Sequence, residues 1–98
     1  MASYELYTFC WDSEGQEAAG FTKLYEGEPM TDEELVEWAK ESAREEIKSQ
    51  GGEIYHEEGN LMQYTFPEIA GMEYNEYLWV SIFDGETAYD WDLEEVKE

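Results

Sequence analysis

The sequence predicts an α+β fold, in which one main helix packs on one face of an antiparallel sheet of about five to six strands. One stretch, residues 32–49, has apolar residues at helical spacing. The stretches on either side of it are rich in β-branched and aromatic residues and are broken by Gly, Asn and Asp, which is typical of strands and turns. The length of 98 residues fits one small core, so residues 1–98 are expected to form a single acidic domain.

The first predicted strand covers residues 3–11. Both of its faces are largely apolar, so it is expected to lie in the centre of the sheet. A polar loop, residues 12–20, leads to a short second strand, residues 21–25, which can pair back on the first. Alternation places Tyr4, Leu6, Thr8 and Cys10 on one face of the first strand and Glu5, Tyr7, Phe9 and Trp11 on the other.

The helix is predicted over residues 32–49. Thr31 and Glu34 have the spacing of a capping box, and Gly51 and Gly52 are expected to end the helix. Two rows recur at i+4 spacing: a core stripe of Leu35, Ala39, Ala43 and Ile47 with Val36 beside it, and a basic row of Lys40, Arg44 and Lys48 that can pair with Glu37, Glu41 and Glu45.

Two hairpins are predicted after the helix. Residues 53–56 and 61–66 flank a turn at 57–60, and residues 77–83 and 87–91 flank a turn at Asp84 and Gly85. A two-residue turn there would set Phe83 opposite Glu86 and Val80 opposite Tyr89. Ile82, Val80 and Leu78 would then face the core, and the other face would carry Phe83, Ser81, Trp79 and Tyr77 opposite Glu86, Ala88, Asp90 and Asp92.

The charge favours basic partners. The chain has 26 acidic and five basic residues, a formal charge of −21. The predicted helix holds seven acids and three bases, or −4, so the remainder carries −17. Spread evenly over roughly 5,800 Å² of surface, the charge would average about one per 280 Å², against roughly one per 110 Å² for duplex DNA. If the charge were gathered on one face, its density there would match that of DNA. Nucleic acid and anionic membranes would repel such a protein, so no direct binding to either is expected.

No catalytic residue, metal site or cofactor is predicted. His56 has no Ser or Cys partner in its sequence context, and Cys10 lies in an apolar run that suits a packed hydrophobe. Residues 12–17 depart from the pattern of a calcium loop. The lone cysteine, the absence of a signal peptide and the absence of a long apolar run predict a cytoplasmic protein.

The predicted site is a partner-binding surface. Its acids lie outside the helix and its anchors are aromatic, as at protein interfaces. The alternative is that Tyr77 and Trp79 pack under the N-terminal segment or under residues 67–75, and an exposed apolar sheet face could also form a homodimer. The candidate residues are Glu53, Glu57, Glu58, Glu73, Glu76, Tyr77, Trp79, Glu86, Asp90 and Asp92.

In its 26 acids, five bases and one-domain length, the chain resembles the small acidic proteins of phages and mobile elements that inhibit restriction or CRISPR systems by mimicking DNA. The resemblance implies an anti-restriction or anti-CRISPR inhibitor whose carboxylates occupy the Lys/Arg-lined groove of a nucleic-acid-binding enzyme. The chain is also similar in size and acidity to bacterial immunity proteins that block basic nuclease toxins. A salt-adapted small domain and an enzyme acting on a cationic substrate are the remaining alternatives.

Overall fold

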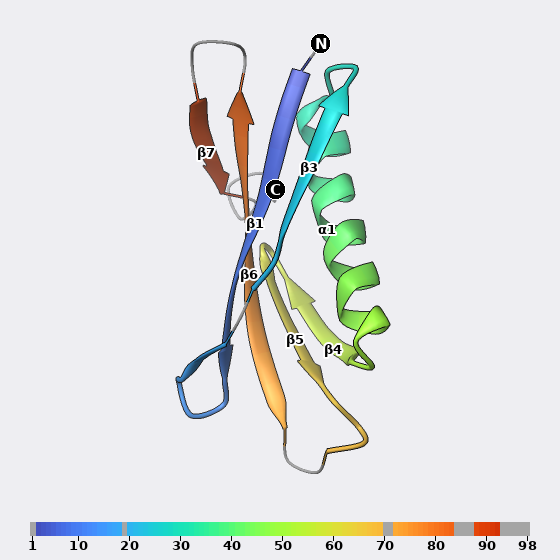
Figure 1. Ribbon diagram of the computed structural model, residues 1–98, viewed down its shortest axis with the longest axis vertical. Coiled ribbons are helices and arrows are strands. Elements are labelled where there is room, and N and C mark those ends of the chain that lie inside the picture. Colours follow the sequence, from blue (N-terminus) through green and yellow to red (C-terminus); the bar gives the residue numbers. More distant parts are fainter. Residues whose placement is uncertain (1, 19, 70–71, 84–87, 93–98) are drawn as a thin grey trace.

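The chain folds as α+β, with one helix packed on an antiparallel sheet of seven strands (Figure 1). The computed structural model describes residues 2–18, 20–69, 72–83 and 88–92. The elements are β1 (Ala2–Asp12), β2 (Glu17–Ala18), β3 (Thr22–Gly27), α1 (Asp32–Ser49), β4 (Glu53–Glu58), β5 (Leu61–Thr65), β6 (Glu73–Phe83) and β7 (Ala88–Asp92).

The two longest strands, β1 and β6, form the centre of the sheet. They pair antiparallel from Ser3 opposite Phe83 to Asp12 opposite Tyr74. Each has two outer neighbours in succession: β1 pairs first with β3 and then with β2, and β6 pairs first with β5 and then with β7. The sheet therefore has two halves, β3-β1-β6-β7 and β2-β1-β6-β5-β4, which share only the central pair.

The two halves meet at Thr8 of β1 and Leu78 of β6, which lie opposite each other. We call this level the waist. The amide of Phe21 donates to the Thr8 hydroxyl at 2.7 Å, and the amide of Leu78 donates to the carbonyl of Asn60 at 2.9 Å. Gly20 lies so close to Thr8 that a Cβ on it would overlap the carbonyl oxygen of Thr8. At the waist, backbone groups of the neighbouring loops therefore form hydrogen bonds to the central pair from both sides.

Helix α1 begins and ends as the sequence predicts. The Thr31 hydroxyl accepts from the amide of Glu34 at 3.1 Å, and the Glu34 carboxylate accepts from the amide of Thr31 at 3.0 Å. The amide of Gly52 donates to the carbonyl of Ile47 at 2.9 Å, which closes the C-terminal turn. The predicted stripe of Leu35, Ala39, Ala43 and Ile47 is buried against one face of the sheet, where it meets Tyr4, Leu6, Cys10, Met62, Tyr64, Leu78 and Val80.

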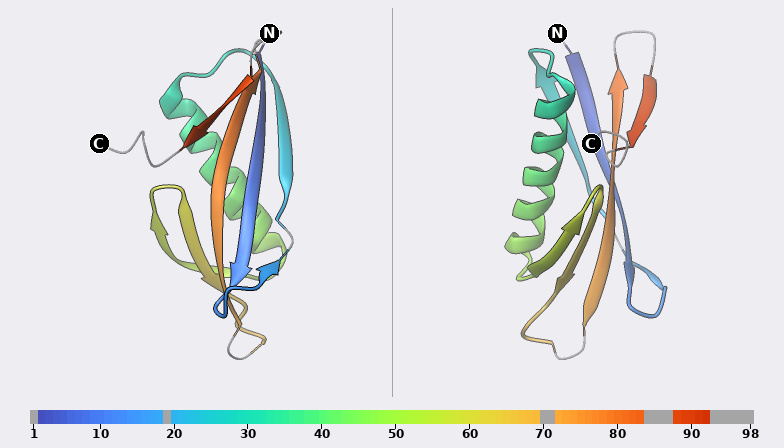
Figure 2. Two further views of the ribbon diagram at one scale, coloured as in Figure 1. Left: turned by 90° about the vertical axis from the view of Figure 1, so that its left-hand side faces the viewer. Right: turned by 180° about the vertical axis from the view of Figure 1, so that it is seen from behind.

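The opposite face of the sheet is turned away from α1. Figure 2 (left) views this face, and the helix lies behind the strands. It carries the odd-numbered residues of β1 and β6 with their partners on the neighbouring strands. Within the described ranges no helix or strand covers it, and we call it the open face.

The hairpins differ from the predictions in detail. Strands β4 and β5 extend to Glu58 and from Leu61, so their turn is only Gly59 and Asn60, with a positive φ of 58° at Gly59. The predicted turn at Asp84 and Gly85 lies outside the described residues. The predicted pairing around it is wrong, because Val80 lies opposite Trp91 and Phe83 opposite Ala88. The observed register is shifted by two residues, an even number, so the positions of residues 88–92 keep their predicted faces.

Candidate functional site

Four aromatic rings form the centre of the open face. Phe9 and Trp11 come from β1, and Tyr77 and Trp79 come from the neighbouring β6. The ring centroids are 5.8 Å apart for Phe9 and Trp11, 5.1 Å for Trp11 and Tyr77, 6.1 Å for Tyr77 and Trp79, and 6.4 Å for Trp79 and Phe9. These contacts close a circuit, which we call the aromatic square. Tyr7, opposite Trp79, extends it toward the β3 half.

The aromatic square is accessible to a partner. Phe9 is 39% exposed and Trp79 is 37% exposed, whereas the helix-facing neighbours Leu78 and Val80 are fully buried. Tilted ring pairs at these spacings stabilise one another, so the rings form a fixed surface. Such an apolar patch on a chain with a net charge of −21 is typical of an interaction site.

Acidic residues surround the aromatic square on the open face. Glu17 lies opposite Trp11, and the position of Asp92 lies opposite Trp79. Residues directly opposite each other on antiparallel strands have Cβ atoms about 4.5–5.5 Å apart, so Glu17 adjoins the Trp11 ring. Further acids on this face are Glu5, Glu26, Glu53, Glu58 and Glu73, together with the position of Asp90.

The basic residues that the structure describes lie away from the open face. Four of the five, Lys23, Lys40, Arg44 and Lys48, fall in the described part of the chain, and none of these is on the open face. Three belong to α1, and Lys23 lies opposite Leu6, whose side chain faces the helix. Within the described ranges, the open face therefore carries negative charge without a compensating Lys or Arg.

The structure brings seven of the ten predicted site residues to the open face. Two predicted acids lie on the helix side instead, which corrects the sequence-based expectation, and Glu86 lies outside the described residues. The seven are Glu53, Glu58, Glu73, Tyr77, Trp79, Asp90 and Asp92, placed by register.

Glu57 is one of the corrected residues. Its two carboxylate oxygens accept from Nε and an Nη of Arg44, each at 2.9 Å. The Arg44 guanidinium also contacts Glu41 at 2.9 Å. The bidentate contact holds the pKa of Glu57 below its ordinary value. This carboxylate is therefore engaged within the protein and does not belong to the open face.

Glu76 is the other. It is only 3% exposed and lies on the helix side of β6, opposite Cys10 and Met62. The Tyr64 hydroxyl donates to the Glu76 carboxyl at 2.8 Å and lies 3.3 Å from the Cys10 sulfur. Because this hydroxyl has a single hydrogen, the Cys10 thiol is the donor in the second contact. The expectation that Glu76 is an exposed partner-binding acid is wrong.

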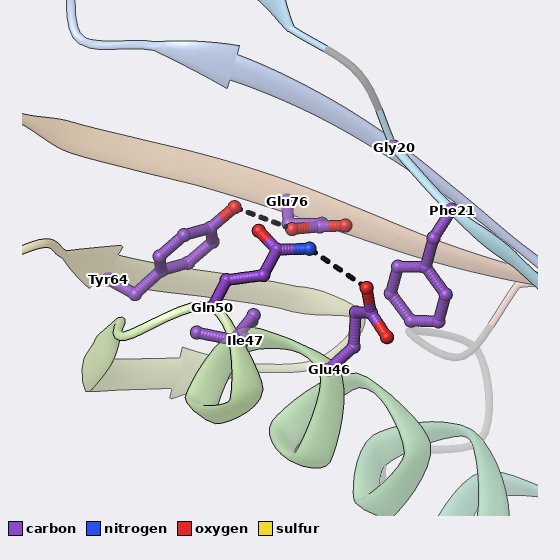
Figure 3. Close-up of a pocket in the computed structure, with 7 residues that line it drawn as sticks. All are labelled: Gly20, Phe21, Glu46, Ile47, Gln50, Tyr64 and Glu76. Atoms are coloured by element: carbon purple, nitrogen blue, oxygen red, sulfur yellow. Dashed lines mark hydrogen bonds between the residues drawn. The ribbon is translucent and has the colours of Figure 1, made fainter.

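Glu76 also lines a cavity of about 180 Å³ between α1 and the sheet (Figure 3). The Gln50 amide reaches into it and donates to the Glu46 carboxylate at 2.8 Å. Phe21 and Ile47 form its apolar part. The volume is below the roughly 300–1,000 Å³ of ordinary ligand pockets, so the space suits water or a very small molecule.

The described residues provide little for nucleophilic chemistry. Burial, only partly opposed by the Tyr64 contact, raises the pKa of the Cys10 thiol, which disfavours the reactive thiolate. Burial also raises the pKa of Tyr64. His56 is exposed and contacts Glu58 at 3.2 Å. It is far from Cys10 in the sequence and lies on the opposite face of the sheet. Across the described ranges, no group of three or more His, Cys, Asp or Glu side chains is arranged to hold a metal ion.

Sequence reasoning missed the β1 part of the aromatic square. The alternation in residues 3–11 put Phe9 and Trp11 on one face, but only the pairing of β1 with β6 places them beside Tyr77 and Trp79. The expected alternative was that Tyr77 and Trp79 pack under the N-terminal segment. They lie beside it instead, with their rings on the same face as those of β1.

Comparisons of this chain with protein-family models, curated proteins and solved structures found no match. In the part of the chain that the structure describes, no helix has both the length and the apolar composition needed to cross a membrane.

Proposed function

We propose that this protein is an acidic inhibitor that occupies the basic nucleic-acid-binding surface of another protein and blocks it. The target would be a defence protein or another DNA- or RNA-processing protein, as for anti-restriction and anti-CRISPR inhibitors. Carboxylates of the open face would lie where the target normally binds phosphates. The observation that carries the proposal is the segregation of charge: within the described ranges, the open face holds acids around exposed rings and no Lys or Arg.

The density of acids on this face supports phosphate mimicry. The open face, as viewed in Figure 2 (left), is bounded by the longest and shortest extents of the molecule, 45 and 21 Å. Eight acidic positions over about 950 Å² average roughly one per 120 Å², close to the roughly 110 Å² per charge of duplex DNA. All 26 acids over the whole surface of 6233 Å² average only about one per 240 Å².

The aromatic square favours a second candidate, an immunity protein that blocks a basic nuclease toxin. An inhibitor that only follows a phosphate path needs no apolar anchor, whereas an interface that covers an active site has aromatic anchors with a polar rim. Both candidates use the same face and both act by excluding nucleic acid. The identity of the target separates them.

The test is capture followed by displacement. The protein is immobilised, exposed to a bacterial lysate at 50 mM salt and eluted with a salt gradient. Each protein that is recovered is then mixed with labelled DNA or RNA. We expect that adding the acidic protein in equal amount displaces the nucleic acid, and that the displacement weakens steeply between 50 and 200 mM salt. Capture without displacement, or displacement that is independent of salt, would refute the proposal. Recovery of nothing beyond generic basic proteins would also refute it and would favour a salt-adapted domain.

A matched pair of double variants tests the face. Glu17→Lys with Glu58→Lys reverses two exposed charges on the open face, and Glu33→Lys with Glu45→Lys reverses two exposed charges on α1. Both change the net charge by the same amount. Only the first is expected to weaken target binding by 10-fold or more. Equal losses would mean that total charge, and not this face, determines binding.

A further inference from the structure

The aromatic square has no place in simple phosphate mimicry, because phosphates carry no rings. Two of its rings, Phe9 and Trp79, are exposed in spite of the cost of leaving apolar surface in water. The centroids are 5.1–6.4 Å apart and the ring planes are tilted by 35–49°, so neighbouring rings already touch. A partner group therefore cannot insert between them and must lie on their outward faces.

The chemistry of such a group follows from its surroundings. Aromatic faces carry a negative electrostatic potential and attract cations that sit over them. Here Glu17 lies opposite Trp11 on the neighbouring strand, and Glu5 accepts from the hydroxyl of Tyr7 at 3.1 Å. Each acid adds to the attraction for a cation. A second copy of this chain does not fit, because it would place its own open-face acids against these carboxylates.

Of the two cationic side chains, arginine fits this surface better. Its guanidinium is planar and weakly hydrated, so it can stack on a ring while its edge donates two hydrogen bonds to a carboxylate. The ammonium of lysine is a compact, strongly hydrated charge that gains less from an aromatic face. A surface of rings with carboxylates beside them is therefore expected to bind an arginine-rich surface more tightly than a lysine-rich surface of equal charge.

We propose that the aromatic square binds arginine side chains of the partner, so that the surface covered by this protein is arginine-rich. The inference rests on the proposed function, since it names the chemistry of the partner at the same face. It gives the protein a selectivity that charge alone does not provide. Lysine-rich basic proteins would bind through the surrounding acids only, with lower affinity.

Two peptides of equal length and charge test the proposal. One is an eight-residue oligoarginine and the other an eight-residue oligolysine, each titrated into the full chain at 100 mM salt and followed by calorimetry. Two guanidinium–ring contacts are expected to make the arginine peptide bind about 5–30-fold more tightly. Equal affinities for the two peptides would overturn the proposal.

Variants that each remove one ring test which residues cause the preference for arginine. Trp79→Leu and Phe9→Leu each remove one exposed ring of the square, and each is expected to leave one contact and reduce the arginine preference to about 2–5-fold. Ile69→Ala is the control, because Ile69 is 52% exposed and apolar but carries no ring. It should keep the preference. Loss of the preference in Ile69→Ala alone, or an undiminished preference in both square variants, would contradict the assignment.

The wild-type protein provides a readout that does not depend on folding of the variants. The indole N–H signals of Trp11 and Trp79 should shift in NMR spectra when the arginine peptide is added, and that of Trp38 should not, since Trp38 packs beside Tyr25 away from the square. Shifts of Trp38 alone would refute the site. If a captured target releases its nucleic acid as proposed but the protein shows no preference for the arginine peptide, this inference would be overturned and the proposed function would stand.

Discussion

Tyr64→Phe tests the buried polar contact that holds Glu76 inside the protein. Tyr64 and Glu76 are 5% and 3% exposed, and a 2.8 Å hydrogen bond joins them. The substitution removes the hydroxyl and leaves a buried carboxyl without this donor. Hydrogen bonds to charged groups contribute about 1.5–3 kcal/mol, and the adjacent cavity of about 180 Å³ admits water that offsets part of the loss.

We therefore expect Tyr64→Phe to lower the free energy of unfolding by about 2 kcal/mol. For a domain of this size, 1 kcal/mol shifts Tm by roughly 4–8 °C, so Tm should fall by about 8–16 °C. Urea and thermal unfolding followed by circular dichroism measure both quantities. A cost below about 0.5 kcal/mol would mean that the hydroxyl is readily replaced by water, and the reasoning would be refuted.

A double-mutant cycle isolates the contact. Glu76→Met removes the carboxyl, and the combination with Tyr64→Phe removes both partners. Because an apolar pair leaves no unsatisfied group, the double variant should be more stable than the sum of the single effects predicts, by about 1 kcal/mol or more. Strict additivity would show that Tyr64 and Glu76 do not stabilise each other.

Three further predictions concern stability. Gly20→Ala should cost about 1–3 kcal/mol, since the new Cβ would overlap the backbone of Thr8; a melting curve like that of the wild type would contradict the close approach at the waist. The pKa values of Cys10 and Tyr64 are raised in the folded state, so the folded protein holds more protons at alkaline pH and its stability should fall as pH rises above about 8.5; a Tm that stays constant from pH 8 to 11 would refute this. Raising salt from 0.01 to 0.1 M shortens the Debye length from about 30 to about 10 Å and should raise Tm by screening repulsion among the acids; an unchanged Tm would mean that the charges are already well separated.

Local signals in the sequence predicted the helix to the residue. The capping box at Thr31 and the glycines at 51 and 52 act within a few residues of the helix ends, so a single sequence contains all the information they need. The alternation of β6 likewise predicted that Leu78 and Val80 face the core, whereas the alternation of β1 separated its two faces without assigning either one to the core. Even the wrong register of the last hairpin kept the faces correct, because its shift is an even number of residues.

Contacts between distant segments could not be predicted in this way. Strand β6 begins at Glu73 rather than at Tyr77, because pairing with β1 and β5 overrides the low β-propensity of Glu and Asn. This extension places Glu76 inside the protein, where Tyr64 of another strand satisfies it. The short strand β2 within the predicted loop also depends on β1 as its partner. The aromatic square has the same origin, since no local pattern pairs residue 9 with residue 79.

The pairing of β1 with β6 also determines when the open face comes into existence during folding. Asp12 and Tyr74 are partners although 62 positions separate them in the chain, and the remaining pairs of this ladder span still more. Helix α1 and the β4–β5 hairpin can form from neighbouring residues, whereas the central ladder must wait for the closure of a long loop, which is slow. A nascent or truncated chain that lacks β6 would already carry much of the negative charge but none of the assembled ring surface. Selective binding would therefore be a property of the finished fold, acquired in its last step.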